Sequence, residues 1–157
     1  MTATPPLAPD LEAPSTGRLQ LALNVDDLDA AIGFYSRMFG VGPVKVKPGY
    51  ANFAIASPPL KLVLFSGAGE PGTINHLGVE VATADEVGAA EQRLSAAGLE
   101  ATDTCETTCC FAAKTETWLE APDGQRWEWY VKHRDLAGFA SGDAPGDAPE
   151  ADTTCCG

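Results

Sequence analysis

The chain has 157 residues, about one domain of ordinary size, with 10 Lys and Arg against 22 Asp and Glu and a formal net charge of −12. An acidic chain with no basic run is not expected to bind a nucleic-acid backbone or an anionic membrane surface. Hydrophobic residues make up 45% and charged residues 20%, and no apolar run approaches the ~18 residues that cross a bilayer. We therefore expect a soluble, folded protein without nucleic-acid or membrane partners.

The two ends of the chain differ in composition from the part between them. Residues 1–17 contain four prolines, no Lys or Arg and no apolar stretch typical of a secretory signal, and residues 135–157 repeat Gly-Asp-Ala-Pro twice. Such ends cannot bury enough apolar surface to offset the entropy lost on ordering. We predict a disordered N-terminal extension over 1–17, a folded domain over 18–134 and a disordered acidic tail over 135–157.

The first elements of the predicted domain are an alternating strand at 19–26 and a helix directly after it. Asp26 is the candidate N-cap of this helix, and Gly40 lies just past its end. Three strand-like runs follow, around 44–47, 50–56 and 60–66.

The same order of elements occurs again in the second half. A strand at 75–82 leads into a helix that begins with the capping box Thr83-x-x-Glu86 and ends at Gly98. Strand-like runs follow around 102–111, 115–120 and 126–132, with a loop near 112–114. The domain is thus a strand, a helix and three strands, present twice, in modules of about 18–66 and 74–132.

Two such βαβββ modules in one short domain resemble the vicinal oxygen chelate superfamily, also called the glyoxalase/bleomycin-resistance/dioxygenase fold. The resemblance implies an α+β fold in which the two modules form a cupped mixed sheet. It also implies a divalent metal in the cup, held by residues on the first and last strands of each module. Fold alone does not establish function, so the function has to be inferred from the residues of the site.

Strand alternation assigns the candidate ligands. In the first strand of each module the odd positions are apolar, so Gln20 and His76 occupy equivalent positions on the predicted cup face. In the last strands Glu128 aligns with Val63, which leaves Gln20, His76 and Glu128 as candidate metal ligands. This set is similar to the facial triad of non-heme Fe(II) oxygenases with one histidine replaced, although such ligands also accept Mn, Co, Ni or Zn. The alternative is that His76 and Gln20 are ordinary polar strand residues; His133 is expected at the surface.

A pair of adjacent cysteines is the second chemical feature. The motif Thr-Thr-Cys-Cys occurs at 107–110 and again at 153–156, and without an export signal we expect the thiols to be reduced. Two nearby thiolates form a soft chelate suited to trivalent arsenic, Cd(II) or Hg(II). Adjacent strand side chains point to opposite faces, so Cys109 and Cys110 can bind one atom only at a bulge or a strand end. The alternative is that both are small buried hydrophobic residues, and Cys105 is assigned no role.

With both features together, the chain resembles the organoarsenical carbon-arsenic lyases, whose close relatives are often labelled cadmium-induced proteins. The resemblance covers nearly all of residues 18–134, and the Thr-Thr-Cys-Cys motif is its most specific part. It implies Fe(II)- and O2-dependent cleavage of the carbon-arsenic bond in trivalent methyl or aromatic arsenicals, releasing arsenite. The expected enzyme is a cytoplasmic monomer or homodimer in which Cys109 and Cys110 bind the substrate and Cys155 and Cys156 form an accessory thiol pair. The loop at 112–114 is expected to act either as a lid over the pocket or as a passive connector.

Two other functions also fit these residues. The same fold can bind toxic ions without turnover, so the thiols could simply sequester Cd(II) or trivalent arsenic. Another metalloenzyme of the superfamily, an isomerase or a ring-cleaving dioxygenase, is a further alternative, but neither chemistry needs soft ligands. Bound iron would favour oxygenase chemistry, nickel or zinc isomerisation, and thiol-bound cadmium storage.

Overall fold

The computed structural model describes residues 6–12, 17–109 and 112–135. The elements follow the order β1, α1, β2, β3, β4, β5, α2, β6, β7, β8, which is βαβββ twice and confirms the predicted α+β class. The chain divides into two compact units, residues 1–80 and 81–157, here called unit 1 and unit 2. Strand β5, Ile74–Glu80, begins the second sequence module but belongs to unit 1.

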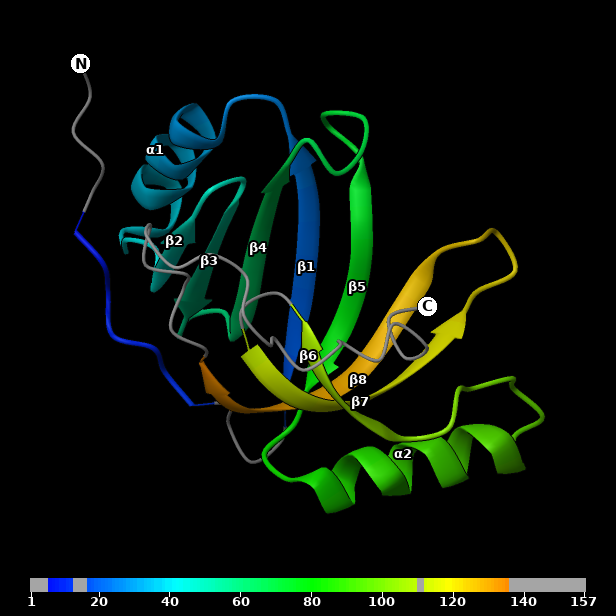
Figure 1. Ribbon diagram of the computed structural model, residues 1–157. Helices are drawn as coiled ribbons and strands as arrows, with labels where there is room; N and C mark the ends of the chain where they lie inside the picture. The colour runs from blue at the N-terminus through cyan, green and yellow to red at the C-terminus, as the bar shows by residue number, and fades with distance from the viewer. Residues whose placement is uncertain (1–5, 13–16, 110–111, 136–157) are drawn as a thin grey trace, which may run out of the picture. The chain divides into compact units, whose positions relative to one another are not determined.

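Unit 1 contains five strands in the order β2-β3-β4-β1-β5, with α1 on one face of the sheet (Figure 1). Strand β1 pairs with β4 in parallel and with β5 antiparallel, whereas β2, β3 and β4 pair antiparallel. The bounds are Arg18–Val25 for β1, Leu28–Phe39 for α1, Lys45–Lys47 for β2, Tyr50–Ile55 for β3 and Leu60–Ser66 for β4.

The N-cap of α1 is Asp27 and not the predicted Asp26. The Asp27 carboxylate accepts a hydrogen bond from the backbone N–H of Ala30 at 2.9 Å, which satisfies one of the unpaired donors of the first turn. The helix ends as predicted at Gly40, whose φ of 70° lies in the left-handed region that glycine adopts without steric cost. The correction is one residue, because either aspartate can cap a helix that follows β1.

The apolar face of unit 1 packs against α1. Its centre is Phe53 on β3, Leu62 and Leu64 on β4, and Ile32 on the helix, and each of these residues is at most 1% exposed. The odd positions Leu21 and Leu23 of β1 pack against the same cluster, as strand alternation predicts. The even positions of β1 therefore lie on the opposite face, which carries the polar residues described below.

A β-bulge interrupts the pairing of β1 with β5. Ala22 pairs with His76 but Leu23 pairs with Ile74, so Asn75 is an extra residue on β5. A bulge changes the direction of a side chain relative to regular alternation. In this strand it lets Asn75 and His76, which are neighbours in sequence, make a direct hydrogen bond and reach residues of the same face.

Unit 2 is an antiparallel sheet of β6, β7 and β8 with α2 packed against it. The Thr83–Glu86 capping box is confirmed, with both hydrogen bonds present. Strand β7 begins at Ala112, so the predicted loop and lid at 112–114 is wrong: this segment is strand, paired with β6 on one side and β8 on the other. The bounds are Ala84–Ala96 for α2, Cys105–Cys109 for β6, Ala112–Glu120 for β7 and Arg126–Asp135 for β8.

Part of the N-terminal extension contacts unit 1. The backbone N–H of Ala8 donates to the carbonyl of Pro43 at 2.8 Å. The tail after Asp135 and residues 1–5 and 13–16 lie outside the described residues. In the described part of the chain, neither helix is long and apolar enough to cross a membrane.

Candidate metal centre

The non-helical face of unit 1 is polar and buried, and we call it the polar face. In β1 the even positions Gln20 and Asn24 are each 5% exposed, whereas Leu19 on the other face is 46% exposed. The strand register places side chains of β3, β4 and β5 on the same face. Its polar members are Arg18, Gln20, Asn24, Asn52, Lys61, His76 and Glu80, all buried.

Gln20 and His76 meet on this face. Gln20 Nε2 lies 3.0 Å from His76 Nε2, although the two residues are 56 positions apart in sequence. The antiparallel register brings them together, because Gln20 pairs with Gly78 and His76 pairs with Ala22, which makes Gln20 and His76 diagonal neighbours two residues apart on one face. An amide nitrogen only donates, so His76 Nε2 accepts this hydrogen bond. The ring of Phe65 lies beside the imidazole, with 6.3 Å between centroids.

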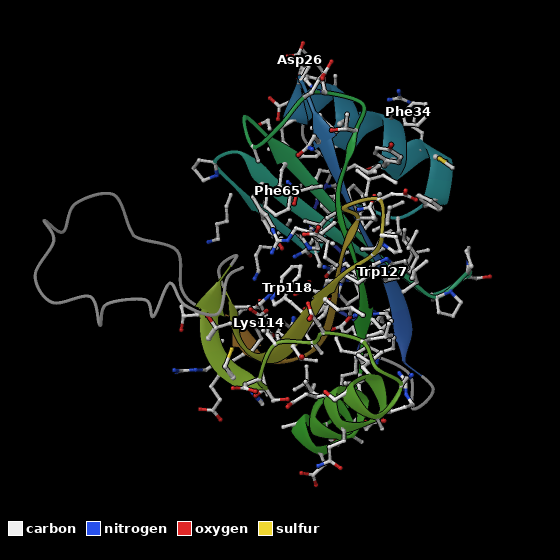
Figure 2. The ribbon with its side chains drawn as sticks, turned by 90° about the vertical axis from the view of Figure 1, so that its right-hand side faces the viewer. Asp26, Phe34, Phe65, Lys114, Trp118 and Trp127 are labelled. Atoms are coloured by element: carbon white, nitrogen blue, oxygen red, sulfur yellow. The ribbon has the colours of Figure 1, made fainter. Side chains whose placement is uncertain are left out.

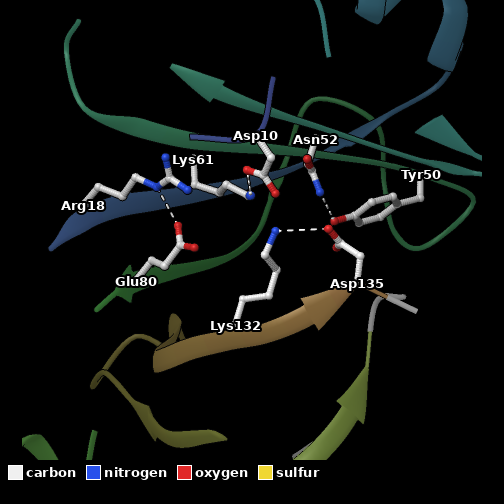
Figure 3. A network of polar contacts seen from close by, with 8 residues as sticks. All are labelled: Asp10, Arg18, Tyr50, Asn52, Lys61, Glu80, Lys132 and Asp135. Carbon is white, nitrogen blue, oxygen red and sulfur yellow. Dashed lines mark hydrogen bonds and ion pairs between the residues drawn. The ribbon is translucent and has the colours of Figure 1, made fainter. Parts of the chain in front are cut away.

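Two ion pairs neutralise buried charge on the polar face (Figure 3). Arg18 Nε lies 2.5 Å from Glu80 Oε2, where the first residue of β1 pairs with the last residue of β5. Lys61 Nζ lies 3.5 Å from Asp10 Oδ1, which comes from the N-terminal extension. Burying an unpaired charge is costly, so these partners allow charged side chains to remain on a face shielded from water.

Glu128 belongs to unit 2, where it is part of a buried charge cluster with Lys114 and Glu116. Lys114 Nζ is 2.8 Å from Glu128 Oε2 and 2.5 Å from Glu116 Oε2, and both carboxylates are at most 1% exposed. The ring of Trp118 is 5.7 Å from the same ammonium, and Figure 2 shows Lys114 and Trp118 close together. Burial raises the pKa of the Glu116 carboxyl above its ordinary value; Lys114 and Trp118 oppose the rise, and Glu128 adds to it.

Sequence reasoning did not single out Lys114, Glu116 or the amides of Asn24 and Asn75. The signal for the first two was present, because Lys114, Glu116 and Trp118 alternate along one strand face. Assigning 112–114 to a loop concealed this periodicity. No sequence signal marked Asn75, because a bulge depends on the register between two strands.

The thiol residues are only partly within the described structure. Strand β6 is described as far as Cys109, and the Cys109 side chain, Cys110, Cys155 and Cys156 lie outside the described parts, so the predicted thiol pair stays a prediction. Cys105 is disulfide-bonded, so the expectation that every cysteine is reduced does not hold for this residue. His133 is exposed, as expected, and its Nε2 lies 2.7 Å from Thr115 Oγ1.

The donor chemistry of Gln20, His76 and Glu128 fits a divalent transition metal. In the described ranges, no three His, Cys, Asp or Glu side chains are grouped so that they could hold a metal ion. The candidate set contains only two residues of those types, His76 and Glu128, and its third member, Gln20, is an amide. His76 presents an accepting Nε2, and Glu128 is a buried carboxylate. Gln20 would bind a metal through Oε1 rather than the Nε2 that now faces His76. Imidazole, carboxylate and amide oxygen are all ligands that Fe(II) accepts.

Comparison with known families decides the classification. The model of the Glyoxalase/Bleomycin resistance protein/Dioxygenase superfamily matches residues 17–129. The chain belongs to this superfamily. The match runs from β1 into β8, so it includes elements of both βαβββ modules, and it confirms the resemblance drawn from the repeat.

Two curated relatives are similar to this chain over most of its length. The chain is 52% identical over 139 residues to the cadmium-induced protein CadI of Mycobacterium tuberculosis H37Rv, covering 88% of this chain and 91% of that protein. It is 51% identical over 140 residues to a trivalent organoarsenical cleaving enzyme of Thermomonospora curvata, covering 88% and 87%. Among solved structures, methylmalonyl-CoA epimerase of M. tuberculosis has a TM-score of 0.55 at 21% identity, covering 82% and 93%, and shows the fold alone.

Proposed function

We propose that this protein cleaves the carbon-arsenic bond of trivalent organoarsenicals, such as methylarsenite and trivalent aromatic arsenicals, and releases arsenite. The reaction uses Fe(II) and O2 and takes place in the cytoplasm, in a monomer or homodimer without nucleic-acid or membrane partners. The observation that supports the proposal most is the match at 51% identity to an enzyme named for this activity, over 88% of the chain. The Gln20–His76 pair supports the metal requirement.

Fe(II) would be held by Gln20, His76 and Glu128. When bound, iron supplies the one-electron chemistry that allows O2 to react with a closed-shell organoarsenical. The chain's own residues hold the ligands in place and keep bulk water away, since all three are at most 7% exposed. A buried setting strengthens each electrostatic contact relative to water.

Cys109 and Cys110 would bind the arsenic. In this step two thiols displace two hydroxyls of R–As(OH)2, forming two As–S bonds and two molecules of water, with no change in oxidation state. A bound arsenical has its carbon-arsenic bond held in one orientation, and such fixation contributes up to about 7–11 kcal/mol in well-oriented systems. This role requires a bulge or a strand end at the Cys109–Cys110 pair, because a regular strand would direct adjacent thiols apart.

The test is an arsenic speciation assay on the full-length protein. The protein is first reduced, because Cys105 is disulfide-bonded, and is then loaded anaerobically with Fe(II). It is mixed with trivalent methylarsenical, with and without air. We expect repeated release of arsenite per protein, only with both iron and air. H76A should abolish turnover, whereas H133N, which changes the exposed histidine, should retain it.

Two other outcomes would contradict the proposal. Tight binding of the methylarsenical without product would indicate thiol-based sequestration, which is the alternative suggested by the cadmium-induced relative. Product formed equally by C109S/C110S protein at low substrate would show that the thiols do not bind the reacting arsenical.

A further inference from the structure

A chain of side-chain hydrogen bonds runs along the polar face of unit 1 to the candidate ligand His76. It begins at the Thr73 hydroxyl, which donates to the backbone carbonyl of Glu70 at 2.6 Å. Asn24 Nδ2 donates to Thr73 Oγ1 at 2.9 Å. Asn75 Nδ2 in turn donates to Asn24 Oδ1 at 3.0 Å. We call Thr73, Asn24 and Asn75 the relay.

The direction of these hydrogen bonds determines which atom of Asn75 faces the imidazole. Because Nδ2 of Asn75 points to Asn24, its Oδ1 lies against His76 Nδ1, at 2.8 Å. A carbonyl oxygen only accepts, so His76 Nδ1 must carry the proton. A neutral imidazole has one N–H, which leaves the lone pair on Nε2.

The opposite side of the ring gives the same answer independently. Gln20 Nε2 lies 3.0 Å from His76 Nε2, and an amide N–H requires an acceptor there. Both contacts therefore agree on the Nδ1–H tautomer. This tautomer leaves Nε2 as the nitrogen that can bind a metal.

The relay is anchored to backbone at its buried member, Asn24. Asn24 N–H donates to the Thr73 carbonyl and Gly72 N–H donates to the Asn24 carbonyl, each at 2.9 Å, so Asn24 is held by main chain as well as side chain. Gly69 packs directly on its amide, since a Cβ at this position would lie 2.7 Å from Asn24 Nδ2. The bulge in β5 completes the arrangement by bringing Asn75 beside both neighbours.

We propose that Asn75 and Asn24, anchored by Thr73, are positioning residues that hold His76 in the Nδ1–H tautomer with Nε2 directed to the metal. The inference rests on the proposed function, which assigns His76 as a ligand. Partners of this kind around metal-bound histidines contribute about 10- to 100-fold to metal affinity.

The experiment measures the His76 tautomer and metal affinity separately. The chain has two histidines, so 15N-labelled histidine gives two sets of ring signals, and H133N assigns them. The tautomer is read from the ring nitrogen signals of metal-free, full-length protein in mildly alkaline buffer. Co(II) titration of the same samples gives the affinity. The variants are N75A, N24A and N24D, with N52A as the matched control.

We expect wild-type protein to show the Nδ1–H form and N75A to show a mixture, with Co(II) affinity about 10- to 100-fold lower. N24A should produce a smaller shift in the same direction, because Asn75 can then turn its amide over. N24D keeps an acceptor for Asn75 Nδ2 and should retain the tautomer. N52A removes another amide of the polar face, as buried as that of Asn24 and bonded to the Tyr50 hydroxyl at 2.6 Å (Figure 3), and should change neither readout.

Several outcomes would overturn the inference. An unchanged tautomer in N75A, or an equal loss of Co(II) affinity in N52A, would show that the amides act only through general packing. A mixed tautomer with wild-type affinity would show that the relay does not serve the metal. If H76A bound Co(II) as tightly as wild type, the ligand assignment itself would fail, whereas absence of arsenite formation with these results intact would refute only the proposed reaction.

Discussion

Burying a charged side chain costs desolvation free energy, and the raised pKa of Glu116 is an example of this cost. Its carboxylate is fully buried and shares the ammonium of Lys114 with Glu128. Desolvation disfavours the charged form, which is why burial raises its pKa. On the polar face of unit 1, Arg18 and Lys61 are likewise paired with acidic side chains, Glu80 and Asp10.

The raised pKa of Glu116 predicts that E116Q stabilises the metal-free protein at neutral pH. A carboxyl with a folded-state pKa above its unfolded value stabilises the fold below the unfolded pKa and loses that contribution as pH rises through the folded pKa. Glutamine resembles the protonated form at every pH. The gain in Tm should therefore be greatest at neutral pH and disappear on acidification. E106Q, on the exposed side of β6, should leave Tm unchanged at all pH values.

Gly69 is not part of the relay but packs against Asn24, so a substitution at Gly69 tests whether the position of the Asn24 amide matters. In G69A the new Cβ would lie 2.7 Å from Asn24 Nδ2, so the amide must move. We expect a lower Tm and a few-fold weaker Co(II) binding by calorimetry. G88A is the control, because a Cβ there meets nothing within 4 Å and alanine in a helix gains about 0.5–1 kcal/mol over glycine. Wild-type affinity in G69A would show that Asn24 tolerates displacement.

At the scale of elements, pairing between strands decides which side chains meet. Strand β5 brings His76 beside Gln20 by pairing with β1, although it begins the other sequence module. Strand β7 extends to Ala112 and thereby places Lys114 between two buried carboxylates. Both contacts depend on the strand register, because a shift of one residue would move these side chains to the opposite face of the sheet.

Lys114 should be essential to the stability of the β7–β8 pair. K114M keeps the length of the side chain but leaves two buried carboxylates without the ammonium, and loss of one partner of a buried pair costs about 3–5 kcal/mol. Chemical denaturation gives the free energy of unfolding. K132M, which removes the more exposed contact of Lys132 with Asp135 at 3.3 Å, should cost at most about 1 kcal/mol. Equal losses in both variants would contradict a special role for Lys114.

At the scale of the whole molecule, the second Thr-Thr-Cys-Cys motif, at 153–156, lies at the end of the acidic tail. We propose that Cys155 and Cys156 capture thiophilic substrate and raise its concentration near the site, since a tethered group has a high effective concentration. Deletion of residues 141–157 should then lower kcat/KM and leave kcat unchanged in the speciation assay.

The matched control for this deletion is C155S/C156S in the full-length chain. It should reproduce the loss of kcat/KM if the thiols are responsible. A decrease of kcat at saturating substrate in either protein would refute the accessory role and indicate that the tail contributes to the reaction itself.

The amino-acid sequence by itself determined the βαβββ repeat, the α+β class, the superfamily and the capping of both helices to within one residue, because periodicity and capping are local properties. It also indicated that Gln20 and His76 share a strand face. Only the tertiary structure decided that these two side chains touch, that Asn75 orients the imidazole and that Lys114 joins Glu116 to Glu128. These contacts depend on strand register and on a bulge, and such pairings arise between residues far apart in the chain.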